Sequence, residues 1–405
     1  MRPGRSQQHV LQWNLRIRSL HLSTHHLSRE WPGAPLLRTN ATYRIGSLVA
    51  TVLADSWRRS PQELQCSETD VAEITPLLVA SMSGALAWHK VRNSDLKTSA
   101  AGLELQEAYR FHSVCTLVRE HAIKRVLTLL YREGVEPILI KGWAAARLYP
   151  ERGLRPYGDI DLVVRSEQYS ATASAISAAI AANEIDTAYY IDLHRGFEDL
   201  DDHSFDDLYS HSAILQLDDV DVRVLSPEDH LRILCVHLLH HNAFRPLWLC
   251  DIAAAVENRA ENFDWNRCLG RHNRRADLVA CAIGLAHELL GADVARTPVA
   301  RRAERLASWL IANVLKQWET PYSMSQAPVR HRAPMAKYLR DPRGLLKDLR
   351  RRWPNAIEAT VFVGGPFNEL PRWPFQVGEC IGRTAKFIAR LPSALREGGD
   401  CLRLH

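Results

Sequence analysis

The sequence predicts an α+β fold in which a small sheet is embedded in a largely helical protein. Residues 103–133 carry apolar side chains at mixed three- and four-residue spacing, which is typical of a helix. A short apolar run at 137–140 and a run at 159–164 that alternates acidic and apolar residues are strand patterns. After residue 225 most of the chain returns to helical spacing.

The stretch from Glu136 to Arg165, EPILIKGWAAARLYPERGLRPYGDIDLVVR, contains the centre of this sheet. The first strand ends in Lys141-Gly142, and a helix is expected over 143–149. A turn segment rich in proline and glycine leads to the second strand. Gly134 after Arg132 is a C-cap signal that ends the preceding helix just before the first strand.

Asp159 and Asp161 alternate with apolar residues on the second predicted strand. Side chains two apart on a strand point to the same face, so the two acids should stand side by side with Ile160 and Leu162 on the other face. Two carboxylates this close repel each other unless a cation lies between them or one is protonated. A hard divalent ion with oxygen ligands, such as Mg²⁺, is the expected occupant.

Two further strands are predicted beyond a helix over 166–183 that Ser166 should cap. The run 189–194 places Asp192 between two apolar residues, with His194 on the same face. The run 220–224 also alternates and carries Asp221.

Helices should follow, beginning at Ser226-Pro227, where proline suits the first helical position. Further helices are expected within 253–290, over 301–318 and over 380–391. His237, His240 and His241 share one helical face. Packing between helices is the favoured interpretation of these histidines. A zinc site is the alternative, although His-Glu-x-x-His is absent.

The wording LIKGWAAARLYPERGLRPYGDIDLVV resembles the DNA polymerase beta-like nucleotidyltransferase superfamily, in which a glycine turn and helix precede Asp-hydrophobic-Asp on a strand. It is most similar to the bacterial branch called uncharacterised nucleotidyltransferase family proteins, where Lys-Gly replaces Gly-Ser. The resemblance runs from about Phe111 to Glu257. Two features depart from it: sixteen residues separate Gly142 from Asp159, and Trp143 occupies a position where relatives have a small residue.

The resemblance implies a polymerase beta-like core that holds Mg²⁺ or Mn²⁺ and uses a nucleoside triphosphate, with ATP the expected one. It implies catalytic and metal-binding roles for the carboxylates and nucleotide contacts for the residues around them. The implied metal ligands are Asp159, Asp161 and Asp192. The implied nucleotide-contacting residues are Lys141, Gly142, Arg155 and His194.

Three of these assignments have alternatives. Asp221 is the rival of Asp192 for the third carboxylate. His194 either positions substrate, acts as a general base, or is a structural histidine bonded within the sheet. Arg155 either reaches a phosphate, which its planar fork suits, or forms a structural ion pair with a local acid. We expect Arg245 and Asp251 to pair across a turn between two helices.

Charge is divided unevenly along the chain. Residues 296–405 contain 20 Lys and Arg against 9 Asp and Glu, and residues 1–295 contain 31 against 37. The net charge is therefore −6 before residue 296 and +11 from there on. Such a division suits a polyanionic substrate. Solvated helix faces are the alternative explanation for the basic end.

The remaining features narrow the class of protein. Eight scattered cysteines without Cys-x-x-Cys favour thiols in a reducing compartment. No apolar stretch reaches the roughly 20 residues of a membrane span, and the first 20 residues have no apolar core long enough for a secretory signal. We therefore expect a cytoplasmic protein. The absence of G-x-x-x-x-G-K-[ST] and G-x-G-x-x-G argues against a P-loop kinase and a Rossmann enzyme.

Five regions are expected: a flexible leader at 1–42, a helical region at 43–110, a nucleotidyltransferase core at 111–225, a helical domain at 226–320 and a basic C-terminal region at 321–405. The favoured function is transfer of a nucleoside monophosphate from a nucleoside triphosphate to an unknown small molecule, peptide or protein, with release of pyrophosphate. A catalytically silent protein of this fold is the first alternative. An RNA-acting transferase is the second, and nucleic acid is the less favoured partner.

Overall fold

The computed structural model describes residues 43–185, 190–196, 200, 203–303, 305–320 and 353–396, with only the backbone described for 386–396. These residues belong to one compact unit, Tyr43–Tyr322 with Arg332–His405. The expected leader at 1–42 and the first part of the expected basic C-terminal region, 321–352, lie outside the described residues. The region boundaries given above stay predictions.

The strands of the described chain form a five-stranded mixed sheet in the order β3-β2-β1-β5-β4. The pairs β1–β2 and β4–β5 are antiparallel, whereas β1–β5 and β2–β3 are parallel. The strands are β1 (Ile138–Ile140), β2 (Ile160–Val164), β3 (Ile191–Arg195), β4 (Ala213–Leu217) and β5 (Val220–Val224).

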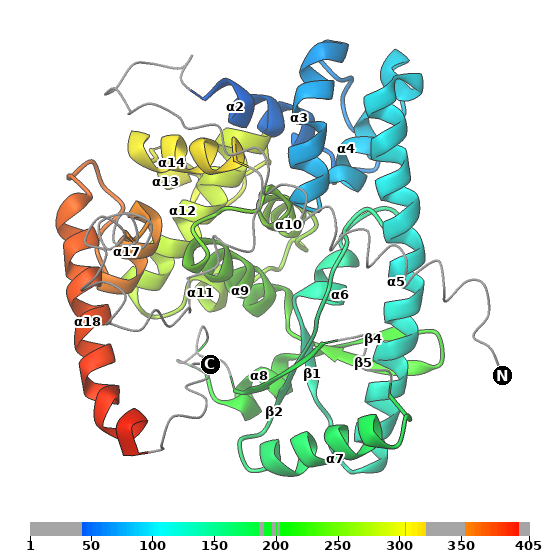
Figure 1. The fold of residues 1–405 in the computed structure, drawn as a ribbon, viewed down its shortest axis with the longest axis vertical. Coiled ribbons are helices and arrows are strands. Elements are labelled where there is room, and N and C mark those ends of the chain that lie inside the picture. Colours follow the sequence, from blue (N-terminus) through cyan, green and yellow to red (C-terminus); the bar gives the residue numbers. More distant parts are fainter. Residues whose placement is uncertain are drawn as a thin grey trace. The chain divides into compact units, whose positions relative to one another are not determined.

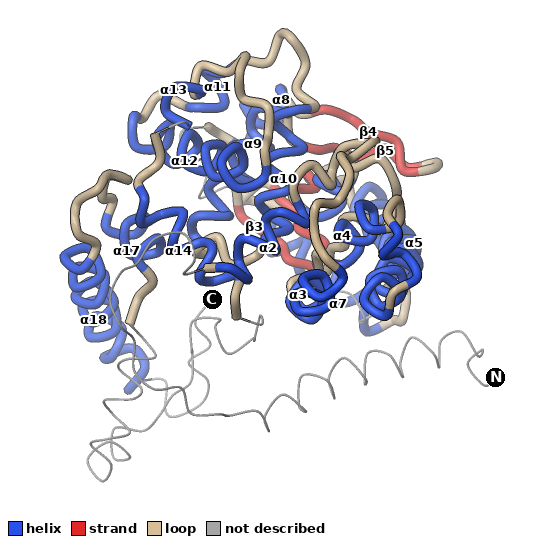
Figure 2. The backbone as a smooth tube through the Cα atoms, turned by 90° about the horizontal axis from the view of Figure 1, so that it is seen from above, coloured by secondary structure: helices blue, strands red, loops and turns tan. Residues whose placement is uncertain are grey.

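Five helices adjoin this sheet: α5 (Ala100–Arg132), α6 (Gly142–Ala146), α7 (Tyr169–Ala181), α8 (Phe205–His211) and α9 (Pro227–His240). The other helices are α2 (Arg44–Leu53), α3 (Glu68–Ala80), α4 (Gly84–Val91), η2 (Asp95–Thr98, 3₁₀), α10 (Pro246–Glu257), α11 (Trp265–Leu269), α12 (Asn273–Leu290), α13 (Ala300–Ala303), α14 (Ser308–Trp318), α17 (Ala356–Val363) and α18 (Trp373–Arg396). The expected α+β fold is confirmed, and Figure 2 shows the strands lying among many more helical segments.

The alternation along β2 separates two apolar cores on the two faces of the sheet. Ile160 and Leu162 are buried against α5 and α7. Val163 faces the other way, into a smaller core with Leu208 of α8 and Ile233 of α9. Asp161 alternates with the apolar pair and therefore shares the face of Val163. Figure 1 shows α5 running beside the sheet, from α3 and α4 at one end to α7 at the other.

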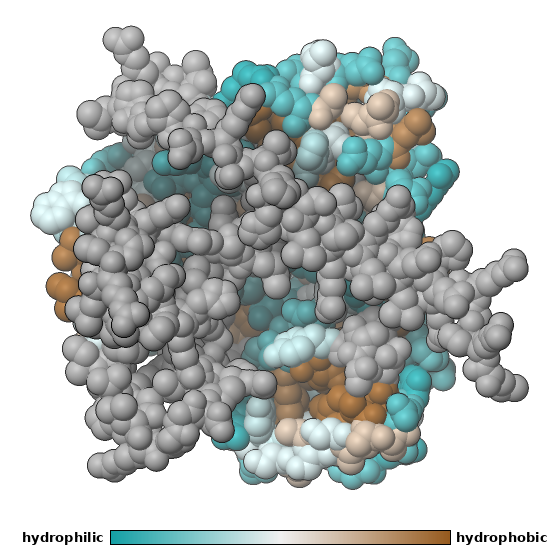
Figure 3. Space-filling view, viewed as in Figure 1, coloured by the Kyte–Doolittle hydropathy of each residue, from teal (hydrophilic) through white to brown (hydrophobic). Residues whose placement is uncertain are grey.

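A third and larger core lies away from the sheet and joins most of the helices. It includes buried side chains from α2, α3, α4, α9, α10, α12, α14 and α17. Part of α9 therefore packs on the sheet and part on the helical core. The space-filling view shows polar and apolar patches alternating on the described part of one face (Figure 3).

Several element boundaries differ from the predicted ones. Ser166 does not cap α7, which begins at Tyr169 with no side-chain cap. The expected helix over 301–318 is two short helices, α13 and α14. Ser226 does cap α9, because its hydroxyl accepts a hydrogen bond from the Asp229 amide and Pro227 takes the first helical position.

Candidate active site

The centre of the candidate site forms where β2 and β3 run in parallel. Their register sets Asp161 opposite Asp192. Ligand atoms of Asp161, Asp192 and His194 all lie within 4.8 Å of one another, and among the described residues this is the one such group of three. We call these three side chains the acid–histidine cluster. It gathers because parallel neighbouring strands bring their matching faces together.

His194 bonds to both acids of the cluster. Its Nε2 atom lies 3.5 Å from Asp161 Oδ1 and 3.2 Å from Asp192 Oδ2. The hydrogen bonds to Asp161 and then to Asp192 raise the pKa of His194 to about 9. At neutral pH the imidazolium therefore balances part of the carboxylate charge. A metal ion would have to displace that proton before it could use the ring nitrogen as a ligand.

Asp159 lies beside the cluster and not within it. It immediately precedes β2, two residues before Asp161. Desolvation raises the pKa of Asp159, and the carboxylates of Asp161 and Asp192 raise it further. Arg245 and Arg119 act in the opposite direction. The three predicted carboxylates therefore interact electrostatically, and two of them are in the cluster itself.

Lys141 approaches the cluster from an unusual backbone conformation. Its Nζ donates a 3.5 Å hydrogen bond to Asp161 Oδ1. Its backbone has φ +52° and ψ −121°, in a region that residues with a side chain rarely adopt. Such strain persists only where the surrounding structure enforces it, and it is often found at functional sites.

Gly142 follows Lys141 and is packed against the strand that carries the acids. A Cβ at this position would lie 3.3 Å from the backbone oxygen of Asp159. A side chain here would therefore press on the lead-in to β2. Glycine at this position lets the two backbones approach closely. We call residues 141–142 the Lys-Gly turn.

The turn between α9 and α10 supplies a group of rings next to Lys141. The ring centroids of His237 and Trp248 are 4.4 Å apart, and those of Phe244 and Trp248 are 5.0 Å apart. The Arg245 guanidinium lies 5.1 Å from the Trp248 ring centroid. Burial and then the charge of Lys141 lower the pKa of His237 well below its usual value, and the same two causes lower the pKa of His241 to about 4. These two histidines are therefore neutral at pH 7.

The zinc alternative for these histidines finds no support among the described residues. His237 and His241 pack with Trp248, with their own ring centroids 4.5 Å apart. His240 instead stacks on Phe362 of α17, with ring centroids 5.7 Å apart. The favoured interpretation, packing between helices, agrees with these contacts.

Arg155 is not directed at an open phosphate site. Its side chain is buried and forms a two-pronged ion pair with Asp251 of α10, in which Nη2 lies 2.6 Å from Oδ2. This geometry favours the ion-pair alternative, although the acid is 96 residues away and not local. Asp251, which the sequence predicts to pair with Arg245, forms its ion pair with Arg155.

Asp221 lies on β5, which is separated from β2 by β1. It contacts Gln216 of the neighbouring β4. The described contacts thus bring Asp192, and not Asp221, to Asp161. That arrangement favours Asp192 as the third carboxylate.

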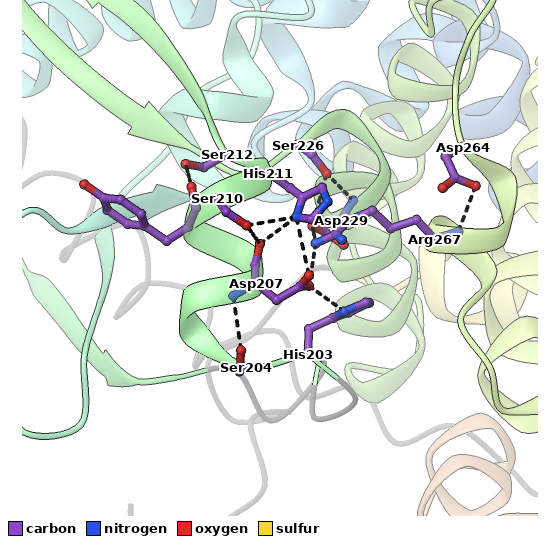
Figure 4. Close-up of polar contacts among 11 residues, drawn as sticks. His203, Ser204, Asp207, Ser210, His211, Ser212, Ser226, Asp229, Asp264 and Arg267 are labelled. Atoms are coloured by element: carbon purple, nitrogen blue, oxygen red, sulfur yellow. Dashed lines mark hydrogen bonds and ion pairs between the residues drawn. The ribbon is translucent and has the colours of Figure 1, made fainter.

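Two features near the site have no counterpart in the predictions. One is that Tyr149 and Arg155 both bind Asp251, which lies 102 and 96 residues away from them along the chain and shares no local pattern with them. The other is a polar network around Asp207 on α8. There Arg267 bonds to both Asp207 and the buried Asp229, and His203 lies 2.7 Å from Asp207 (Figure 4). This network ties α8 to α9 and α11, so it stabilises the helices over the acid-bearing face of the sheet.

More than half of the sequence matches the model of one protein family. The model of the family described as uncharacterised nucleotidyltransferase matches residues 67–291, which is more than half of the chain. The protein therefore belongs to this nucleotidyltransferase family, as its resemblance implied. No curated protein and no solved structure matches it. In the described part of the chain, none of the helices has both the length and the apolar character needed to cross a bilayer.

Proposed function

We propose that this protein is a metal-dependent nucleotidyltransferase that transfers a nucleoside monophosphate from a nucleoside triphosphate to an acceptor. ATP is the proposed donor. The acceptor is a hydroxyl or similar group on a small molecule, a peptide or a protein. Pyrophosphate is the second product. The observation that carries the proposal is the pairing of Asp161 with Asp192 on adjacent parallel strands, with His194 and Lys141 against them.

The donor set of the cluster fits a divalent metal ion. Asp161 and Asp192 offer carboxylate oxygens, the ligands that Mg²⁺ and Mn²⁺ prefer, and His194 offers a nitrogen that Mn²⁺ also accepts. Asp159 lies beside them, and its pKa is raised first by burial and then by the charges of Asp161 and Asp192. A cation bound here would relieve the second of these effects. When bound, the metal supplies charge neutralisation at the phosphates and acidifies the attacking hydroxyl.

The chain's own residues then orient and stabilise the reacting groups. The acceptor oxygen forms a bond to the α-phosphorus, and the bond from that phosphorus to the bridging oxygen breaks, with the electron pair leaving on pyrophosphate. The acceptor's proton passes to a carboxylate of the site. Lys141, held 3.5 Å from Asp161, is placed to bind the negatively charged phosphates, which costs no reorganisation during the reaction.

Label transfer tests this proposal directly. The purified protein is incubated with Mg²⁺ or Mn²⁺ and ATP labelled on its α-phosphate, with and without cell extract, and pyrophosphate is measured in parallel. We expect metal-dependent label incorporation that Asp161→Asn and Asp192→Ala reduce at least about a hundredfold, because each variant removes a carboxylate that would hold the metal.

Asp221→Ala is the matched control, since it removes an acid from the same sheet but away from the cluster. It should only weaken activity. A loss with Asp221→Ala that equals the loss with Asp192→Ala would move the third carboxylate to β5. If no nucleoside triphosphate is bound and neither label transfer nor pyrophosphate appears, the chain is a silent member of its family. Transfer that occurs only onto RNA would favour the RNA-acting alternative.

A further inference from the structure

A buried ion pair connects the helical domain to the Lys-Gly turn. Arg155 donates from Nε to Asp251 Oδ1 at 3.0 Å and from Nη2 to Asp251 Oδ2 at 2.6 Å. The Arg155 side chain is 6% exposed and that of Asp251 is fully buried. Tyr149 donates a 2.8 Å hydrogen bond to Asp251 Oδ1. Both carboxylate oxygens of Asp251 are thereby satisfied.

The remaining nitrogen of Arg155 contacts backbone on both sides of the site. Nη1 donates to the carbonyl oxygen of Gly142 at 3.4 Å and to that of Pro156 at 3.3 Å. The first carbonyl belongs to the Lys-Gly turn, and the second lies three residues before Asp159. One guanidinium thus holds the turn that presents Lys141 and the segment that presents the acids.

The same ion pair fixes α10 against these segments. Asp251 is three residues after Trp248 on α10, so the two side chains lie on neighbouring positions of one helical face. The ring group of the α9–α10 turn is therefore anchored by the contact that anchors the Lys-Gly turn. One buried arginine therefore contacts both α10 and the two backbone segments of the site.

Stability alone does not explain why charges occupy this position. Removing two charges from water costs several kcal/mol per ion, and a well-packed apolar pair of similar volume is often as stable. A planar guanidinium instead offers a geometry that an apolar side chain lacks, because it can satisfy a carboxylate and two carbonyls in fixed directions. The strained backbone of Lys141 also needs surroundings that enforce it.

We infer that Arg155 is a positioning residue of the nucleotidyl transfer reaction, holding the Lys-Gly turn and the approach to β2 in register through Asp251. The inference rests on the proposed function. Arg155 does not touch the nucleotide itself. Its contribution is to keep Lys141 and the carboxylates at the separation that the transfer requires, where a misplacement of about 1 Å can cost roughly a hundredfold in rate.

Arg155→Lys is the principal test, because it keeps the positive charge and removes the planar fork. A second buried pair far from the site, Lys90 with Asp55 at 2.9 Å, supplies the matched control through Asp55→Asn. Tyr149→Phe removes one hydrogen bond to Asp251 and leaves the ion pair, so it remains informative if Arg155→Lys fails to fold. For each variant we measure Tm and the Kd of Mn²⁺ in the absence of nucleotide. We also measure kcat and KM for ATP at a temperature well below the lowest Tm.

We expect Arg155→Lys to lower kcat at least about tenfold while the Kd of Mn²⁺ changes less than about threefold, and Tyr149→Phe to lower kcat about threefold. Asp55→Asn should lower Tm without a comparable change in kcat. The inference is overturned if Arg155→Lys lowers kcat no further than Asp55→Asn does. If Arg155→Lys does not fold, an unchanged kcat for Tyr149→Phe overturns it. A wild-type protein that transfers no label with any nucleoside triphosphate refutes the proposed function itself and removes the inference with it.

Discussion

His230 is a buried imidazole next to the Arg155–Asp251 pair. Its Nε2 atom is inaccessible to solvent and has no hydrogen-bond partner among the described residues. Burial lowers the pKa of His230 to about 4, with Asp251 acting to raise it and Arg155 to lower it. The native protein therefore keeps this side chain neutral, whereas the unfolded chain protonates it below its usual pKa of about 6.5.

This difference predicts a specific acid sensitivity. The stabilising contribution of neutral His230 is complete above about pH 6.5 and is lost as the pH falls toward 4, because the unfolded state binds the proton first. The loss amounts to about 3 kcal/mol at pH 4. We expect His230→Leu to remove this part of the pH dependence, so that its free energy of urea unfolding falls by about 3 kcal/mol less than that of the wild type between pH 6.5 and 4. Parallel curves for wild type and variant would contradict the prediction.

Individual residues also show how cations are distributed at the site. Lys141 and protonated His194 both contact Asp161, so the cluster carries compensating positive charge without a metal. His237 and His241 also feel the charge of Lys141, and they are neutral because burial and that lysine oppose their protonation. Lys141 thus acts on two faces of different character, the acid-bearing face of the sheet and a helix face that carries neutral rings. A ligand with both phosphates and a planar base would match the two faces.

Among the elements, the Lys-Gly turn joins β1 to α6 in a conformation that suits glycine better than lysine. The cost of φ +52° for a residue with a side chain is about 1–3 kcal/mol. Substitution at Lys141 can separate this backbone cost from the role of the charge. Lys141→Gly removes both the strain and the charge, whereas Lys141→Met keeps the strain and removes the charge.

We expect Lys141→Gly to be more stable than Lys141→Met by about 1 kcal/mol in urea unfolding, because their charge loss is the same. Both variants should lose label transfer at least about tenfold, because phosphate binding requires the ammonium group. A Lys141→Gly protein that is less stable than Lys141→Met would show that the turn is not strained. Full activity in either variant would remove Lys141 from the proposed site.

Elements with a clear pattern were predictable, and those specified by distant partners were not. Alternation over 159–164 predicted that Ile160 and Leu162 are buried opposite the acids, as the structure confirms. The strand β4 was missed because Ala213–Leu217 is a short, mostly apolar run whose period is ambiguous. Its hairpin with β5 had a signal in the two-residue connection Asp218-Asp219, where Asp218 has φ +53°.

The site was predictable only in part for the same reason. Acids alternating on a strand indicate a shared face, but the register that sets Asp161 opposite Asp192 depends on pairing between strands about 30 residues apart, and the family resemblance was needed to favour it. The Arg155–Asp251 pair has no local pattern at all. Arginine and aspartate 96 residues apart become partners only when α10 packs beside α6. The burial and geometry of this ion pair therefore follow from the tertiary structure and not from the local sequence.

At the scale of the whole molecule, α17, which lies in the described part of the basic C-terminal region, is built into the helical core. Ile357 of α17 is fully buried and Val361 is 3% exposed, and both belong to the large helical core. Arg383 of α18 pairs with Glu358 of α17. Deleting this region to test for RNA binding would therefore also disturb the core. Replacing exposed arginines by glutamine, followed by measurement of the salt dependence of RNA affinity, tests the RNA-acting alternative more cleanly.

Two isoleucines of this region test whether it stabilises the fold. Ile357→Ala creates a cavity in the helical core and should lower the free energy of unfolding by about 2–5 kcal/mol. Ile381→Ala, on α18 and with the isoleucine 64% exposed, should change it by no more than about 0.5 kcal/mol. Urea unfolding followed by circular dichroism measures both. Equal effects would mean that α17 is not part of the cooperative core, and that the basic region could be removed without cost to the rest of the protein.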